Sequence, residues 1–131
     1  MGQPAAKQGD TITALDIHII MIPAAAGAPV PTPLPHPFNG IIDGSLSPNV
    51  NVMGMPAATQ GSTATNTPPH IPQGGPFQKP PSNRATIMMG SMRVLINGKP
   101  AARAGDTALT CNDPADLPAG TVVATSTVLM G

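Results

Sequence analysis

Four side chains of this sequence could bind a metal ion together: His18, His36, His70 and Cys111. They are all the histidines and the only cysteine of the chain. Three imidazoles and one thiolate make a closed tetrahedral shell of the kind that holds structural zinc. Such a site contributes its binding free energy to folding, about 10–16 kcal/mol in small zinc peptides. We therefore predict a structural zinc site, with iron as the less favoured metal.

The spacing of these residues follows an internal repeat. Three copies of Pro-Ala-Ala, at positions 4, 56 and 100, are each followed after two residues by Gly and then Asp or Ser. His18 and His70 each lie 14 residues after the proline of their copy, and Cys111 lies 11 residues after the proline of the third. If a pseudo-threefold axis relates the copies, these three side chains converge on that axis.

The simpler alternative is that these residues bind nothing. A single histidine in a Pro-rich loop is usually solvated, and a lone cysteine is usually a small buried hydrophobe. The equal offset of His18 and His70 favours the metal site, whereas His36 has no counterpart in the other copies and Cys111 has the shorter offset. Asp16, two residues before His18, is expected to support an imidazole from outside the ligand shell.

The repeat also predicts the elements that position these residues. Residues 50–56 match residues 94–100 at a shift of 44, and each segment is a short apolar run that ends in a residue plus Gly. This pattern is typical of a strand entering a tight hairpin turn. Residues 127–131 form a strand and turn that would complete the hairpin begun at residues 1–4. We predict one all-β domain over 1–131, a small pseudo-threefold cone of short strands and hairpins with repeats around 4–18, 50–70 and 94–111 and with residues 127–131 closing on the N-terminus.

Two Pro-rich stretches separate the repeats, Pro29–Pro37 and Pro68–Pro81. Inside a repeat architecture they are expected to be stiff loops between hairpins. In isolation they would instead suggest linkers, or ligands of small recognition domains. Gly and Pro make up about a quarter of the chain, which suits a small all-β body or a disordered segment. Only 9% of residues are charged, which disfavours disorder.

Charge and hydropathy exclude two classes of partner. The net charge is zero, which removes the electrostatic attraction that dominates nucleic-acid binding. The N-terminus lacks the pattern of a signal peptide, and the apolar stretch Ile17–Pro29 is too short to span a bilayer. We expect a protein made in the cytoplasm, with no nucleic-acid partner and no stable membrane insertion.

The third copy continues as Pro100-Ala101-Ala102-Arg103, the motif that gives the PAAR family its name. The chain resembles a PAAR spike-tip protein over nearly its whole length. The resemblance implies a metal near the apex held by three His and one Cys. It also implies a wide base docked on a trimeric VgrG/gp5-like β-helical spike, one tip per trimer, and effector proteins as possible further partners. Such a tip would be made in the bacterial cytoplasm, assembled on an injection particle and delivered into the target with the spike.

The base is expected to consist of the alternating apolar runs that precede the hairpin turns. A trimeric spike ends in open strand edges, to which three hairpins could add. Methionines near these runs would adapt to a surface that is not fully symmetric. The candidate spike-binding residues are Val50, Val52, Met53, Val94, Ile96, Val128 and Met130.

These observations predict a mechanical function rather than an enzymatic one. The chain contains no Glu, and no nucleophile with a neighbouring base and orienting group is apparent. The repeating Gly-Asp pairs suit turns better than acid–base chemistry. The expected role is a membrane-piercing tip of a type VI secretion system, a phage-like particle or a released injection particle. The alternatives are a small zinc-binding module or enzyme without a spike, and a disordered Pro-rich interaction segment.

Overall fold

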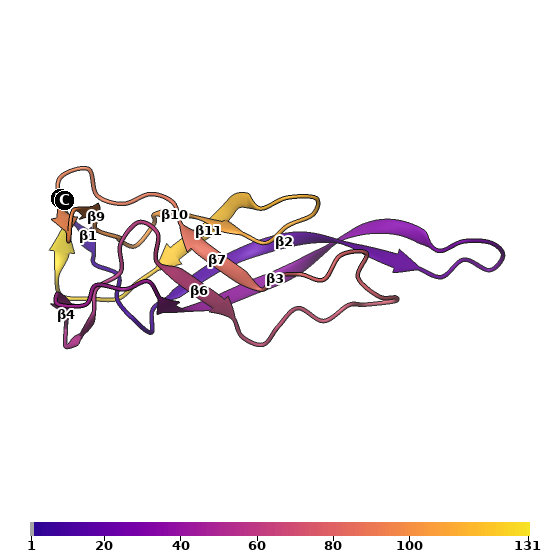
Figure 1. The fold of residues 1–131 in the computed structure, drawn as a ribbon, viewed down its shortest axis with the longest axis horizontal. Helices are drawn as coiled ribbons and strands as arrows, with labels where there is room; N and C mark the ends of the chain where they lie inside the picture. The colour runs from indigo at the N-terminus through magenta and orange to yellow at the C-terminus, as the bar shows by residue number, and fades with distance from the viewer. Residues whose placement is uncertain (1) are drawn as a thin grey trace.

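The computed structural model describes residues 2–131 and folds them into an all-β body with no helix. One end is broad and carries β1, β4, β9 and the C-terminus (Figure 1). The other end narrows to one long hairpin, whose turn spans residues 23–29. We call these the base and the narrow end. The all-β class predicted from the sequence is confirmed.

Six strands form a closed barrel in the order β10-β11-β2-β3-β6-β7, with every neighbouring pair antiparallel. Consecutive strands form three hairpins that stand side by side around the barrel, one for each sequence repeat. The strands are β2 (Thr11–Ile22), β3 (Val30–Gly44), β6 (Thr63–Asn66), β7 (Arg84–Ile87), β10 (Thr107–Thr110) and β11 (Leu117–Val123).

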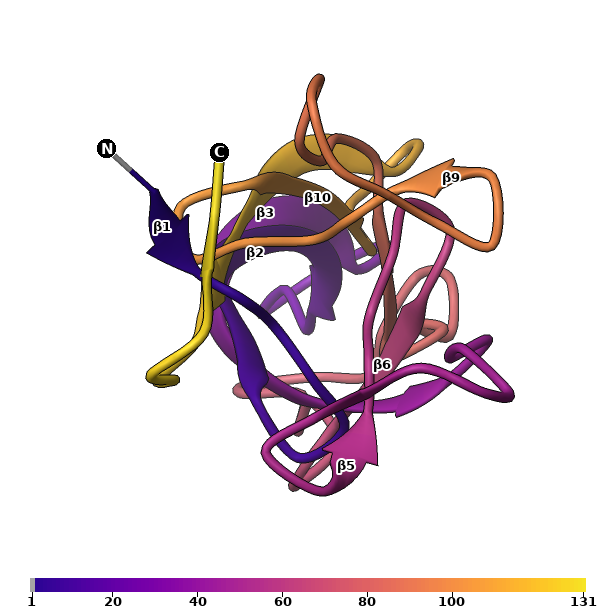
Figure 2. The ribbon, with the colours of Figure 1, turned by 90° about the vertical axis from the view of Figure 1, so that its left-hand side faces the viewer.

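Three two-stranded antiparallel sheets form the base, and β1, β5 and β9 are spaced around it (Figure 2). Two of them are hairpins and the third pairs the first strand with the last; we call all three the base hairpins. The pairs are β1 (Gln3–Pro4) with β12 (Leu129–Met130), β4 (Asn51–Val52) with β5 (Met55–Pro56), and β8 (Leu95–Ile96) with β9 (Lys99–Pro100). Equivalent positions on the three hairpins carry the exposed side chains of Gln3, Met55 and Lys99. The base therefore repeats its backbone three times but not its surface chemistry.

The three Pro-Ala-Ala segments meet at the centre of the base. Ala6 N–H donates to Ala102 O at 2.9 Å, Ala102 N–H to Ala58 O at 3.0 Å, and Ala58 N–H to Ala6 O at 3.0 Å. These three hydrogen bonds form a closed ring. Successive residues of an extended chain point to opposite faces, so the first alanine of each copy packs beside Val52 and Ile96 in the base, and the second packs into the barrel. The motif consists of small residues because its three copies pack closely around one axis.

The Gly-Asp and Gly-Ser pairs after each copy form equivalent turns. Gly9, Gly61 and Gly105 have φ of 93°, 95° and 90°, a region that favours glycine. The next side chain accepts a hydrogen bond from a backbone N–H three residues earlier, as Asp106 Oδ2 does from Arg103 N–H at 2.7 Å. These acids are turn residues, as the repeat pattern predicted.

The barrel is filled by a small apolar core. Its largest buried side chains are Ile12, Phe38, Ile42, Ile87 and Val122. Most other members of this cluster are alanines, so the core contains little aliphatic volume for a chain of 131 residues. A body with so small a core needs a further source of stability.

The prediction of a loop at Pro29–Pro37 is wrong. Residues 30–37 belong to β3, which pairs with β2 without interruption from Thr11↔Ile41 to Ile22↔Val30. A strand tolerates prolines when their missing N–H groups lie on an unpaired edge, and the alternating prolines here meet that condition. The second stretch, Pro68–Pro81, contains no strand and joins β6 to β7. β2 and β3 are also much longer than the short strands predicted.

Candidate metal centre

Four buried side chains gather beyond the rim of the barrel, toward the narrow end. The ligand atoms of Asp16, His18, His70 and Cys111 all lie within 4.8 Å of one another. The ring of His36 lies beside them, with its centroid 5.5 Å from the rings of both His18 and His70. The structure thus brings together the four residues singled out from the sequence and adds Asp16.

Each hairpin of the barrel contributes to this cluster. Asp16 and His18 lie on β2, and His36 lies opposite Asp16 on β3. His70 comes from the loop between β6 and β7, and Cys111 directly follows β10. The three repeats therefore converge on one point, where β2 and β3 extend past the strands that flank them.

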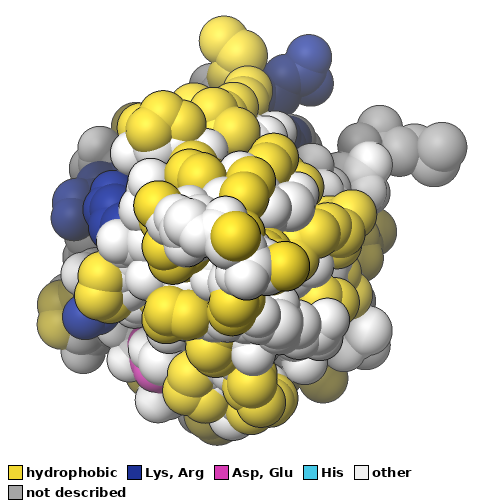
Figure 3. Space-filling model, turned by 90° about the vertical axis from the view of Figure 1, so that its right-hand side faces the viewer, with side chains coloured by type: hydrophobic (Ala, Val, Ile, Leu, Met, Phe, Trp, Pro, Cys, Tyr) yellow, Lys and Arg dark blue, Asp and Glu magenta, His cyan; other side chains and the backbone are white. Residues whose placement is uncertain are grey.

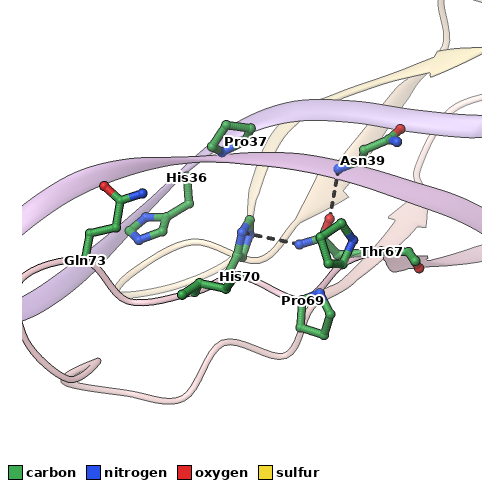
Figure 4. A pocket seen from close by; sticks show the side chains of 10 residues that line it. His36, Pro37, Asn39, Thr67, Pro69, His70 and Gln73 are labelled. Carbon is green, nitrogen blue, oxygen red and sulfur yellow. Dashed lines mark hydrogen bonds between the residues drawn. The ribbon is translucent and has the colours of Figure 1, made fainter.

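Two asparagines hold His70 in place. His70 N–H donates to Asn83 Oδ1 at 2.8 Å, and Nδ1 of its ring lies 3.3 Å from Nδ2 of the buried Asn66. Asn66 Oδ1 also accepts the N–H of Asn39 at 2.9 Å, which ties the end of β6, where the loop begins, to β3 (Figure 4). No sequence pattern that we recognised pointed to these asparagines.

Asp16 is fully buried and touches donors from two other repeats. Its Oδ2 accepts from His70 Nε2 at 2.9 Å and from the Cys111 thiol at 3.4 Å, while its Oδ1 accepts from Thr110 Oγ1 at 2.6 Å. A supporting contact between Asp16 and an imidazole was predicted, although the imidazole that it bonds is that of His70. Its position also qualifies it as a direct ligand.

The loop that carries Cys111 is bonded along the outer edge of β2. Ile17 N–H donates to Asn112 Oδ1 at 2.7 Å and Ile19 N–H to Asp113 Oδ2 at 2.9 Å, and Asp113 N–H donates back to Ile17 O at 2.9 Å. Asn-Asp-Pro is a common turn sequence, but the sequence alone did not reveal that this turn docks on β2.

His18 carries the strongest indication of a ligand. Within residues 2–131, the buried side-chain nitrogen and oxygen atoms that make no hydrogen bond are its Nδ1 and Nε2. The nearest carboxylate, Asp113 Oδ2, lies 3.5 Å from Nδ1 and bonds Ile19 N–H instead. Burial lowers the pKa of His18 below its usual value, so the ring is held in the neutral form that binds metals. Leaving a buried polar atom without a partner costs about 1–3 kcal/mol, a cost that a bound metal ion would remove.

The Cys111 thiol is held in its protonated form. Burial, followed by the nearby carboxylate of Asp16, raises its pKa to about 11. A metal ion that takes this ligand must therefore displace a proton. With neutral His18 and a thiol beside it, the donor set suits a borderline metal such as zinc.

A cavity of about 310 Å³ lies next to the cluster. His36 and His70 form part of its wall, together with Pro37, Pro69 and Gln73 (Figure 4). His36 Nδ1 lies 2.9 Å from Leu34 O, which leaves Nε2 as its free nitrogen. His36 and His70 are thus the members of the cluster that border this cavity.

Comparison with known families shows to which family the chain belongs. A family model described as the PAAR motif matches residues 34–114 and 77–131. The chain belongs to the PAAR family. The matched segments contain the second and third Pro-Ala-Ala copies together with His36, His70 and Cys111. The resemblance inferred from the sequence is confirmed.

PAAR proteins are associated with the spikes of contractile injection systems such as the type VI secretion system, and the family is structural rather than catalytic. No curated protein matches the chain. Residues 2–131 contain no helix that is long and apolar enough to cross a membrane. In this PAAR chain the buried Asp, His, His and Cys cluster could bind a metal ion.

The raised pKa of Cys111 predicts how the metal-free protein responds to alkali. The folded state holds the thiol proton up to about pH 11, whereas the unfolded thiol releases it near its ordinary pKa of 9.0. Stability from this group is therefore present below pH 9.0 and is lost as the pH rises toward 11. We expect the urea midpoint of chelator-treated protein to fall over this range.

Cys111→Ser is the matched control for this alkaline loss. The chain has no Tyr, so lysines are the main other groups that titrate over this range, and they are common to both proteins. The difference between the two urea midpoints should shrink as the pH rises. A difference that stays constant from pH 8 to 11 would contradict the assignment.

Proposed function

We propose that this protein caps the end of a trimeric spike as its piercing tip, one chain per trimer. The observation that carries the proposal is the base, where three equivalent hairpins surround a ring of three main-chain hydrogen bonds. A single chain with this arrangement can present one base hairpin of similar backbone shape to each subunit of a threefold partner. Membership of a spike-associated family supports the same partner.

The base surface is apolar enough to dock. Leu95 is 62% exposed, Leu129 61% and Met53 56%, and each lies on a different base hairpin. Val50 and Val128 are also exposed beside them, whereas Val52 and Ile96 are buried beneath and Val94 and Met130 pack against the same cluster. Of the candidate spike-binding residues, Val50, Met53 and Val128 therefore have side chains that could meet a partner directly. The others would support the hairpins from below.

A bound zinc ion would lock the narrow end of the tip. His18, His70 and Cys111 would hold it, with His36 as the fourth ligand and Asp16 supporting His70. The ion would supply a structural cross-link between the three repeats, in place of the apolar volume that the small core lacks. Iron is the less favoured metal. The unpartnered nitrogens of His18 support the proposal.

The same proposal covers where the protein acts. We expect it to be made in the bacterial cytoplasm, to assemble on an injection particle and to leave the cell with the spike, carrying effector proteins if these bind its sides. A catalytic role is disfavoured because the PAAR family is structural rather than catalytic. The ordered all-β fold also leaves no support for a disordered interaction segment.

Co-purification with its trimeric spike tests this function. The expected result is a complex of one chain per three spike subunits, measured by multi-angle light scattering or native mass spectrometry. The comparison must use protein whose circular dichroism spectrum shows intact β structure. Folded, metal-loaded protein that does not associate with the spike trimer would refute the tip assignment and leave a zinc-binding module as the better description.

A further inference from the structure

Proline occupies every second position along the segment that enters and forms the outer half of β3. The members are Pro29, Pro31, Pro33, Pro35 and Pro37, which we call the proline row. In a β-strand, backbone N–H groups of alternate residues point to the same edge. Five missing N–H groups of one parity therefore fall on a single edge of β3.

The hydrogen bonds of β2 show which edge this is. Ile17, Ile19 and Met21 donate their N–H groups away from β3, to Asn112 Oδ1, Asp113 Oδ2 and Pro76 O respectively. The even-numbered residues of β2 must then face β3. Their register partners are Val30, Thr32, Leu34 and His36, none of which is proline. The proline row therefore faces away from β2.

The row begins where the barrel stops pairing with this edge. Gly40, Ile41 and Ile42 pair with β6. Asn39, the next outward-facing position, still donates its N–H to Asn66 Oδ1 at 2.9 Å and accepts from Thr67 N–H at 3.0 Å. From Pro37 outward, each residue of this parity is a proline. The edge loses its donors at the point where it loses its strand partner.

The other edge of the same hairpin is covered instead. The loop residues 111–113 and 76–78 bond to β2 along this edge, and Gln78 N–H donates to Ile19 O at 2.9 Å. The projecting hairpin thus has one edge closed by loops and one edge closed by prolines. Both edges are unable to offer the alternating donors and acceptors that a new strand needs.

Charge does not protect this hairpin. Open edges in soluble proteins are commonly guarded by lysine or other charged side chains. Between Asp16 and Asp43 the chain has no Asp, Glu, Lys or Arg, and Val30 is 53% exposed. Hydrophobic side chains cover much of the narrow end, with basic side chains at its margin (Figure 3). An uncharged apolar hairpin with a free donor edge would be expected to pair with another of its kind.

We propose that the proline row blocks strand addition by a second copy of this chain. It keeps the projecting hairpin unpaired although residues 17–42 carry no charged side chain. The partner that it excludes is another β3, whose edge has the same length and the same apolar character. The inference needs no bound metal and no spike, so it stands or falls separately from the proposed function.

The test restores the missing donors. In P31T/P33T/P35T, three outward N–H groups return in residues that favour strands. The expected result is concentration-dependent association to a mass of two chains or more in sedimentation and light scattering, where the wild type shows less. The new amides at positions 31, 33 and 35 should gain protection from hydrogen exchange on the order of 100-fold as the concentration rises.

Two further variants make the result decisive. P31K/P33K/P35K restores the same donors but adds charge, and it should stay as dispersed as the wild type. If it associates as strongly as the threonine variant, a loosened hairpin rather than the open edge is responsible, and the proposal is wrong. P33T alone, a milder change, covers the case in which the triple variant does not fold. Folded threonine variants that remain dispersed, with freely exchanging new amides, would also overturn it.

Discussion

Replacing Cys111 by serine and His70 by alanine is expected to abolish tight metal binding and to lower the thermal midpoint by on the order of 15 °C. The two residues come from different repeats and meet only at the cluster. Without them, the loop between β6 and β7 and the loop after β10 lose their common anchor. The alanine-rich core of the barrel contains too little buried volume to compensate. Elemental analysis and circular dichroism melts measure both effects.

Metal-depleted wild-type protein is the control for this double variant. After treatment with a strong chelator, it should melt close to the double variant, because both lack the same cross-link. About one metal ion per chain retained in the variant would show that the ligands lie elsewhere. A cooperative melt at the wild-type temperature without metal would show that the metal contributes nothing to stability.

Visible absorption and metal affinity separate the roles of His36 and Asp16. In protein loaded with cobalt, His36→Gln is expected to shift the visible absorption bands, because a ligand has changed. Asp16→Asn is expected to leave the bands in place and to weaken metal affinity about 10–100-fold, as the loss of a supporting hydrogen bond does. The opposite pattern would make Asp16 the fourth ligand.

An aspartate on each base hairpin is expected to weaken binding to the trimeric spike by more than about 100-fold. The variant is M53D/L95D/L129D, and all three wild-type side chains are more than half exposed. A buried carboxylate without a partner is costly in an apolar interface, while an exposed one costs the free tip little. Surface plasmon resonance or calorimetry gives the affinity, and a urea titration checks that the fold is retained.

Ile71 supplies the matched control for the base. It is 68% exposed and lies on the loop between β6 and β7, away from the base hairpins. Ile71→Asp makes the same chemical change and should leave spike affinity unchanged. Equal losses in both variants would mean that general surface charge disturbs the complex, and would remove the base as the docking surface.

Much of this architecture could be predicted from the sequence because the same sequence pattern occurs in three copies, each of which forms the same local structure. The shift of 44 residues located two base hairpins, and the equal offset of His18 and His70 placed two members of the cluster. The Gly-Asp pairs were correctly interpreted as turns. In each case a local pattern has a local structural cause, such as the positive φ of Gly105.

The remaining features depend on contacts between distant segments. The proline-rich strand looked like a loop because its pairing partner, and so its paired edge, cannot be known before β2 is placed beside it. The sequence suggested Asp16 as a support, but its bonds to His70 and Thr110 arise only when three hairpins close the barrel. The docking of Asn112 and Asp113 on β2 is equally non-local.

The three base hairpins carry different side chains at equivalent positions, and this difference has a consequence for any threefold partner. Turning the chain by one third of a revolution leaves the backbone of the base almost unchanged but exchanges Gln3, Met55 and Lys99. A symmetric socket would accept three orientations that differ only in side-chain energy, so a population of complexes would be rotationally degenerate. Images averaged under threefold symmetry would then superimpose the density of Gln3, Met55 and Lys99. Only a reconstruction without imposed symmetry would resolve these three side chains separately.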